Sequence, residues 1–241
     1  MLKDLVKFIL PNSITNYIRT IKKQIINFKI LSIEYGQFET IKRWSCIDKN
    51  GNPIPWFTYP CIEYLNHLDL SECVVFEYGS GYSTLYWLSK ARKVISVEHD
   101  ENWYREINYK IKGKINKDKL TYYLLKNEND YISAINKINQ FIDVIVIDGR
   151  WRRKCAESVA KHIKSFGGGM LIFDNSDWYP NTIKFLRNEL NWIEIDFIGF
   201  SPINNYTLCT SIFFNPTYRF TYKENLKPIG GIVQISEEDS V

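Results

Sequence analysis

Acidic side chains end four apolar runs of this 241-residue chain: Glu77, Glu98, Asp148 and Asp174. If such runs form the parallel strands of a doubly wound sheet, their carboxyl ends meet at one edge, where such sheets bind ligands. Strand ends without a function usually finish in ordinary turn residues, so the four acids together indicate a site. Any single one of them can instead cap the helix that follows.

Residues 77–83, with the sequence EYGSGYS, have the composition of a cofactor-binding loop. Gly79 and Gly81 permit a tight turn and a close backbone approach to a ligand, and Ser83 or Thr84 can cap the next helix. A dinucleotide fingerprint requires a third small residue at position 84, which is Thr here. An acid before the first glycine would repel a pyrophosphate and attract a cationic cofactor. The loop therefore favours S-adenosylmethionine, with Glu98 placed to accept both ribose hydroxyls.

The apolar runs alternate with helical patterns from residue 71 onward. Strands are expected over 74–78, 94–98, 120–125, 142–148, 170–173, 192–200 and 209–215, and helices over 83–90, 102–115, 131–139, 152–165 and 181–190. This alternation predicts an α/β protein with a Rossmann-like, doubly wound, mostly parallel seven-stranded sheet. The turn before the last run places one antiparallel strand in it. Residues 71–215 form this domain, and 216–241 are expected to be an irregular tail.

Residues 1–70 are expected to form an N-terminal helical extension followed by an aromatic loop. The first 30 residues carry one acid, Asp4, and six basic side chains: Lys3, Lys7, Arg19, Lys22, Lys23 and Lys29. The isoleucines share one helical face: Ile14, Ile18, Ile21 and Ile25. This face can pack on the main domain or contact anionic lipid. The loop of residues 44–60, rich in proline and tryptophan, can line a substrate pocket or cover a sheet edge.

Composition narrows the class of protein. A formal charge of +4 and 45% apolar residues suit a compact enzyme and do not by themselves indicate nucleic-acid binding. Five scattered cysteines without a Cys-x-x-Cys pair predict a reduced intracellular protein without structural zinc. No apolar run approaches the ~20 residues of a membrane span. We expect a cytoplasmic protein. The basic N-terminal segment adds the possibility of peripheral contact with the inner face of a membrane. The sequence does not specify an oligomeric state.

The loop sequence EYGSGYS, followed by VEHD, resembles the first two motifs of class I S-adenosylmethionine-dependent methyltransferases. DVIVIDG and GGGMLIFDN resemble their fourth and fifth strands, so the resemblance covers roughly residues 71–215. The family usually has a third glycine where this chain has Ser83. The resemblance implies that the methionine part of the cofactor lies against Glu77, Gly79, Ser80 and Gly81. It further implies that Glu98 holds the ribose hydroxyls, that His99 and Asp100 lie next to the adenine, and that Asp148 lies near the methyl group.

A narrower similarity is to catechol-type, metal-dependent O-methyltransferases. These carry an Asp after the fourth strand and an Asp-Asn pair after the fifth, matching Asp148, Asp174 and Asn175. The resemblance implies that these three residues are catalytic and hold Mg²⁺, which would acidify an acceptor hydroxyl. Asp174 and Asn175 can instead begin a turn. Without a cation, one aspartate would take up a proton or pair with Arg150 or Arg152.

The resulting hypothesis is O-methylation of a small-molecule or glycan hydroxyl. The basic residues of 150–154 open a helix against its dipole, which suggests either an acidic acceptor or a solvated helix start. A nucleic-acid methyltransferase is the alternative, but base-amine enzymes usually carry an Asn/Asp-Pro-Pro-aromatic run where this chain has DGRW. A third possibility is a non-catalytic cofactor-binding scaffold of the same fold.

Overall fold

The computed structural model describes residues 12–112, 117–223 and 231–233. Its centre is a seven-stranded sheet with the order β4-β3-β2-β5-β6-β8-β7. The strands are β2 (Val74–Tyr78), β3 (Lys93–Glu98), β4 (Leu120–Leu124), β5 (Ile142–Ile147), β6 (Gly168–Asp174), β7 (Ile193–Phe200) and β8 (Thr207–Phe214). Strand β8 runs antiparallel to both neighbours, and all other pairs are parallel. The predicted Rossmann-like sheet with one antiparallel strand is confirmed.

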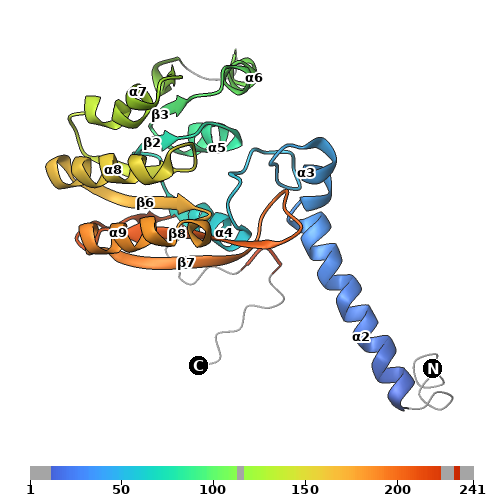
Figure 1. The fold of residues 1–241 in the computed structure, drawn as a ribbon. Helices are drawn as coiled ribbons and strands as arrows, with labels where there is room; N and C mark the ends of the chain where they lie inside the picture. Colours follow the sequence, from blue (N-terminus) through green and yellow to red (C-terminus); the bar gives the residue numbers. More distant parts are fainter. Residues whose placement is uncertain (1–11, 113–116, 224–230, 234–241) are drawn as a thin grey trace.

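Helices cover both faces of this sheet (Figure 1). They are α4 (Tyr59–His67), α5 (Tyr82–Lys90), α6 (Glu101–Ile111), α7 (Glu128–Ile132), α8 (Arg152–Phe166) and α9 (Pro180–Leu190). Alternate strand residues point to opposite faces. Val75 therefore lies in a cluster with α4, α5 and α6, while Phe76 lies in a second cluster with α7, α8 and α9. Burial on both faces explains why the central strands β2, β5 and β6 are continuous apolar runs.

The N-terminal extension differs from the expectation. Helix α2 (Asn12–Lys29) continues through a π-helical turn, η1 (Ile30–Glu34), to α3 (Gln37–Arg43). No residue of α2 is buried, so its isoleucines do not pack on the domain, and the helix projects from the rest of the molecule (Figure 1). Helix α4 does pack on the sheet, with Leu65 fully buried. The hydrophobic core therefore extends N-terminal to the expected boundary at residue 71.

Several smaller expectations are refined. The region predicted as one helix over 131–139 contains α7 and a 3₁₀ turn, η3 (Ser133–Lys137); two further 3₁₀ turns are η2 (Lys117–Lys119) and η4 (Ser176–Trp178). The tail was expected to be irregular, but β9 (Thr221–Tyr222) pairs antiparallel with β1 (Leu68–Asp69). The end of the predicted helix at 113–115, the first eleven residues with Lys3, Asp4 and Lys7, and the acidic C-terminus lie outside the described residues.

All five cysteines are buried and free of disulfides. Within the described ranges, no helix is both long and apolar enough to cross a bilayer.

Candidate active site

The loop after β2 turns sharply and lies directly on the loop after β5. Gly79 has a φ of +90°, and a Cβ there would lie 2.7 Å from the Gly149 backbone, so no larger residue fits without displacing it. Its N–H donates to the carbonyl oxygen of Val97 at 2.9 Å. Gly81 is different, because its φ of 171° is extended and a Cβ would meet Trp103 at an ordinary 3.6 Å. The tight-turn expectation is thus confirmed for Gly79 and wrong for Gly81.

Glu77 anchors the helix that follows this loop. Its carboxylate is fully buried and accepts hydrogen bonds from the hydroxyls of Ser83, at 3.0 Å, and Thr84. Burial raises the pKa of Glu77 to about 7, although these hydroxyls oppose the shift. Thr84 Oγ1 also accepts the Gly81 N–H at 3.0 Å, so Thr84 satisfies the helix start as expected, while Ser83 points to Glu77 instead.

Glu98 also points inward, behind the loop. One of its oxygens accepts the Ser80 N–H at 3.0 Å and the Ser80 hydroxyl at 2.8 Å. The other accepts the backbone N–H groups of His99 and Asp100 at 2.7 and 2.9 Å. The Asp100 side chain caps α6 by accepting the Trp103 N–H at 2.9 Å, so it serves the helix. For Glu98 to accept a ribose hydroxyl, that hydroxyl would have to take the place of Ser80 Oγ.

An arginine, Arg152, joins Asp148, which follows β5, to the backbone at the end of β6. The Arg152 guanidinium donates to Asp148 Oδ1 at 2.9 Å, to Asn175 Oδ1 at 3.0 Å and to the Asp174 carbonyl oxygen. Its Nε donates to the carbonyl oxygen of Gly149 at 3.0 Å. Only 12% of the Arg152 side chain and 20% of the Asp148 side chain are exposed. Arg152 thus connects the two loops, and its pair with Asp148 is one of the alternatives that the sequence predicted for a site without a cation.

In this arrangement the three predicted ligands do not form a site for a divalent cation. Two of the three predicted ligands, Asp148 and Asn175, already accept hydrogen bonds from the positive guanidinium, which would repel a metal ion among the same oxygens. The third, Asp174, accepts a hydrogen bond at Oδ1 from the Thr210 hydroxyl at 2.6 Å. No cluster of three His, Cys, Asp or Glu side chains that could hold a metal occurs in the described part of the chain. The magnesium hypothesis therefore finds no support.

The two aspartates differ from ordinary carboxylates. Burial raises the pKa of Asp148 to about 6, against the lowering effect of the Arg152 charge. Burial, and then the Asp148 charge, raise the pKa of Asp174 well above its usual value. Of the pair, Asp148 is the ionised group at neutral pH, because Arg152 compensates its charge. Asp148 is therefore poised to accept a proton.

Two adjoining cavities open at this edge of the sheet, with volumes of about 700 and about 80 Å³. Both are lined by Trp44, Trp56, Ser80, Trp103, Asp148 and Ile203, and we call their combined space the strand-end cleft. The larger cavity also reaches Arg152, Asp174 and Asn175, and the smaller one reaches Gly81 and Ser83. The cleft thus brings the glycine loop and the acids of β5 and β6 to one space. Glu77, Gly79, Glu98 and His99 do not line it.

The aromatic loop contributes side chains both to the wall of the cleft and to the hydrophobic core. The Trp44 and Trp56 rings lie 6.2 Å apart on the cleft wall, and Trp56 Nε1 donates to Asn204 Oδ1 at 2.5 Å. Phe57 is fully buried in the core. Sequence reasoning missed Trp103, although its place three residues after Asp100, on the first turn of α6, was a usable signal. Nothing in the sequence indicated that the loop between β7 and β8 would line the cleft.

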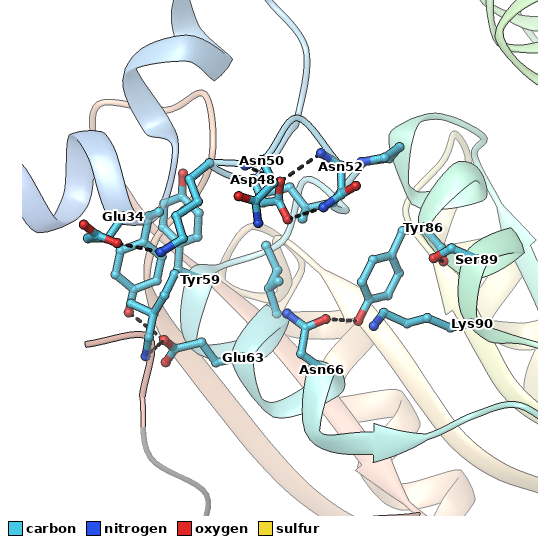
Figure 2. A pocket seen from close by; sticks show the side chains of 16 residues that line it. Glu34, Asp48, Asn50, Asn52, Tyr59, Glu63, Asn66, Tyr86, Ser89 and Lys90 are labelled. Atoms are coloured by element: carbon cyan, nitrogen blue, oxygen red, sulfur yellow. Dashed lines mark hydrogen bonds and ion pairs between the residues drawn. The ribbon is translucent and has the colours of Figure 1, made fainter. Parts of the chain in front are cut away.

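A separate polar cavity of about 390 Å³ lies beside α4 and α5 (Figure 2). There the Tyr86 hydroxyl donates to Asn66 Oδ1 at 3.0 Å, and Lys90 Nζ lies 4.8 Å from the centre of the Tyr86 ring. Burial and the neighbouring Lys223 lower the pKa of Lys90 to about 8. None of the strand-end acids or glycine-loop residues lines this cavity. We therefore place the chemistry in the strand-end cleft.

The strand order with one reversed strand is that of the class I methyltransferase fold. No protein-family model and no curated protein matches the chain. Among solved structures, it is similar to a methyltransferase-like protein from Silicibacter pomeroyi, with 20% identity, a TM-score of 0.45, and coverage of 68% of this chain and 91% of that one. It is also similar to a putative methyltransferase from Streptococcus mutans in complex with SAH, with 14% identity, a TM-score of 0.46, and coverage of 62% of this chain and 92% of that one. A third similar structure is precorrin 8w decarboxylase from Methanobacterium thermoautotrophicum, with 16% identity, a TM-score of 0.45, and coverage of 65% of this chain and 88% of that one. At these TM-scores, function must be argued from the chain's own residues.

Proposed function

We propose that the protein transfers a methyl group from S-adenosylmethionine to a hydroxyl of a small molecule or glycan. The observation that supports this is the strand-end cleft, where Ser80 and Gly81 of the glycine loop share a space with Trp103 and Asp148. A volume of about 700 Å³ is within the usual range for a cofactor pocket. The backbone of the loop, an aromatic wall for the adenine and a carboxylate for the cationic centre suit this cofactor.

The chain's own residues would then position and deprotonate the acceptor. Bound S-adenosylmethionine supplies a methyl group that its sulfonium already activates. Transfer of that group to the acceptor hydroxyl, with S-adenosylhomocysteine as the leaving product, would release the hydroxyl proton, and an Asp148 carboxylate oxygen would accept it. Arg152 holds the carboxylate in place through its hydrogen bond at 2.9 Å. With a pKa of about 6, Asp148 is ready to accept this proton at neutral pH.

The cofactor part of the proposal is tested by titration calorimetry with S-adenosylmethionine and with NAD⁺. Only the first should bind. Glu98→Ala should lose about 1.5 to 3 kcal/mol of binding free energy if a ribose hydroxyl takes its carboxylate. Ser80→Ala is the matched control, because it removes the competing hydroxyl and leaves the carboxylate in place. Equal affinities for wild type and Glu98→Ala would end the ribose assignment, and binding of NAD⁺ alone would end the proposal.

The transfer step is tested by following S-adenosylhomocysteine formation with a panel of hydroxyl acceptors. An Asp148→Asn variant, measured at saturating cofactor because the cofactor's cationic centre loses its nearby carboxylate, should lose turnover by about 10² to 10⁴-fold for a general base. Asp130→Asn, on the exposed surface of α7, serves as a control for the same change of side chain. Full turnover in Asp148→Asn would remove this residue from the mechanism. Cofactor binding without turnover on any acceptor would instead favour a scaffold.

A further inference from the structure

Helix α2 is amphipathic and has no partner that covers it in the described residues. None of its 18 residues is buried, and Figure 1 shows it projecting away from the sheet and its covering helices. Helices in folded proteins owe most of their stability to packing an apolar face. An exposed apolar face of this kind, which the described residues leave uncovered, marks an interaction site.

The apolar side chains of α2 form a narrow stripe. At about 100° per residue, six of them fall within an arc of about 100°: Ile14, Tyr17, Ile18, Ile21, Ile25 and Phe28. Their exposed fractions are between 44% and 68%. No charged residue interrupts the arc. The same helix carries a further isoleucine, Ile26, which is 45% exposed and lies outside the arc.

The charges of α2 specify the kind of partner. The helix contains no acid and four basic residues: Arg19, Lys22, Lys23 and Lys29. Lys22 and Lys29 border the arc on one side, an arrangement typical of helices that lie in the interface of a membrane. A second copy of α2 would bring like charges together, whereas an anionic surface attracts them. Nucleic acid would match the charge and leave the apolar arc unused.

The exposed apolar surface continues beyond α2. Ile33 in η1, Phe38 and Ile41 in α3, and Trp44 just after it are 57%, 61%, 45% and 66% exposed. Tryptophan side chains are favoured at the boundary between lipid and water. Because Trp44 also lines the strand-end cleft, a surface that accepts α2 and α3 would lie near the mouth of the cleft.

We propose that α2 binds flat on an anionic lipid bilayer, with the isoleucine arc buried at the headgroup boundary and its lysines on anionic headgroups. This inference is independent of the proposed methyl transfer. The test is flotation of the full-length protein with phosphatidylcholine vesicles that contain or lack phosphatidylserine. Wild type should float with the anionic vesicles and not with the neutral ones, and salt should weaken binding.

Matched substitutions locate the contact. Ile21→Asn, within the arc, should weaken partitioning about tenfold, whereas Ile26→Asn, with the same chemistry outside the arc, should change it little. Lys22→Gln should weaken it about fivefold, and Lys23→Gln, on the opposite side, less. Since α2 buries nothing, these variants should fold like wild type.

Three results would overturn the proposal. The first is the absence of flotation with anionic vesicles, or equal flotation with neutral ones. The second is equal effects of Ile21→Asn and Ile26→Asn. The third is a dimer in vesicle-free solution that Ile21→Asn converts to monomer, which would make a second copy of the chain the occupant.

Discussion

Replacing Arg152 should destabilise the protein far more than replacing its neighbour Arg150. The Arg152 guanidinium is 12% exposed and hydrogen bonds to Asp148 and Asn175 as well as to backbone carbonyls of two loops. Arg152→Met would leave the buried Asp148 carboxylate without a counter-charge, and breaking such a pair costs about 3 to 5 kcal/mol. Arg150 is exposed, and its guanidinium carbon lies 5.8 Å from the centre of the Trp151 ring. Arg150→Met should therefore change the free energy of unfolding by less than about 0.5 kcal/mol.

The loss in Arg152→Met should depend on pH. Removing the guanidinium removes a cause that lowers the Asp148 pKa, so this pKa rises further above about 6. A carboxyl with a raised folded-state pKa favours folding at low pH, and this advantage is lost as pH rises through the folded-state pKa. The difference between wild type and variant should therefore be small at pH 5 and large at pH 8.

Urea unfolding of both variants at pH 5 and pH 8 measures this difference directly. Two results would refute the reasoning. One is an equal loss for Arg150→Met and Arg152→Met. The other is a loss in Arg152→Met that is the same at both pH values, because packing rather than the ion pair would then be responsible.

Two further predictions concern Glu77 and the metal. Because burial raises the Glu77 pKa from 4.5 to about 7, wild-type stability should fall between these pH values, and Glu77→Gln should be more stable at pH 8 by about 3 kcal/mol. Urea unfolding tests this, and an unchanged pH profile in the variant would contradict it. Because Arg152 already engages Asp148 and Asn175, a chelator should leave methyl transfer intact; loss of activity that Mg²⁺ restores would revive the metal-dependent mechanism.

The central strands β2, β5 and β6 could be predicted from the sequence because they are buried on both faces. Val74–Tyr78 was predicted to the residue, and the other six strands of the main sheet within two residues at each end. Helix α2 could not be placed in the same way. Its periodicity indicates an apolar face, but periodicity does not say what covers that face, and in the structure nothing in the described chain does.

The direction of the strand-end acids was not predictable. Glu77 and Asp148 both end apolar runs, yet Glu77 lies within β2 and points to α5, whereas Asp148 follows the last residue of β5 and lines the cleft. Because side chains alternate along a strand, a shift of one residue in the strand end reverses the direction of the acid. Strand ends were predicted from the sequence only to within one or two residues, and this is too imprecise to say which acid points into the cleft.

The basic residues at the start of α8 were explained in two ways from the sequence, by an acidic acceptor or by a solvated helix start. They oppose the helix dipole, which suggested an acidic acceptor. In the structure Arg153 pairs with Glu157 at 2.8 Å and Lys154 pairs with Glu128. Within the described chain, only Arg150 of the four basic residues at 150–154 has no carboxylate partner, so these contacts do not support an anionic acceptor.

Arg152 has an internal reason to be there. The loops after β5 and β6 each turn through a left-handed residue other than glycine, Trp151 and Asn175, both with a φ of 51°. Such conformations cost about 1 to 3 kcal/mol each and persist only where their surroundings hold them. Arg152 donates to the carbonyl oxygens of Gly149 and Asp174, which lie close to these turns in the sequence. The arginine that opposes the helix dipole therefore stabilises both loops while it holds the carboxylate of Asp148 in the cleft.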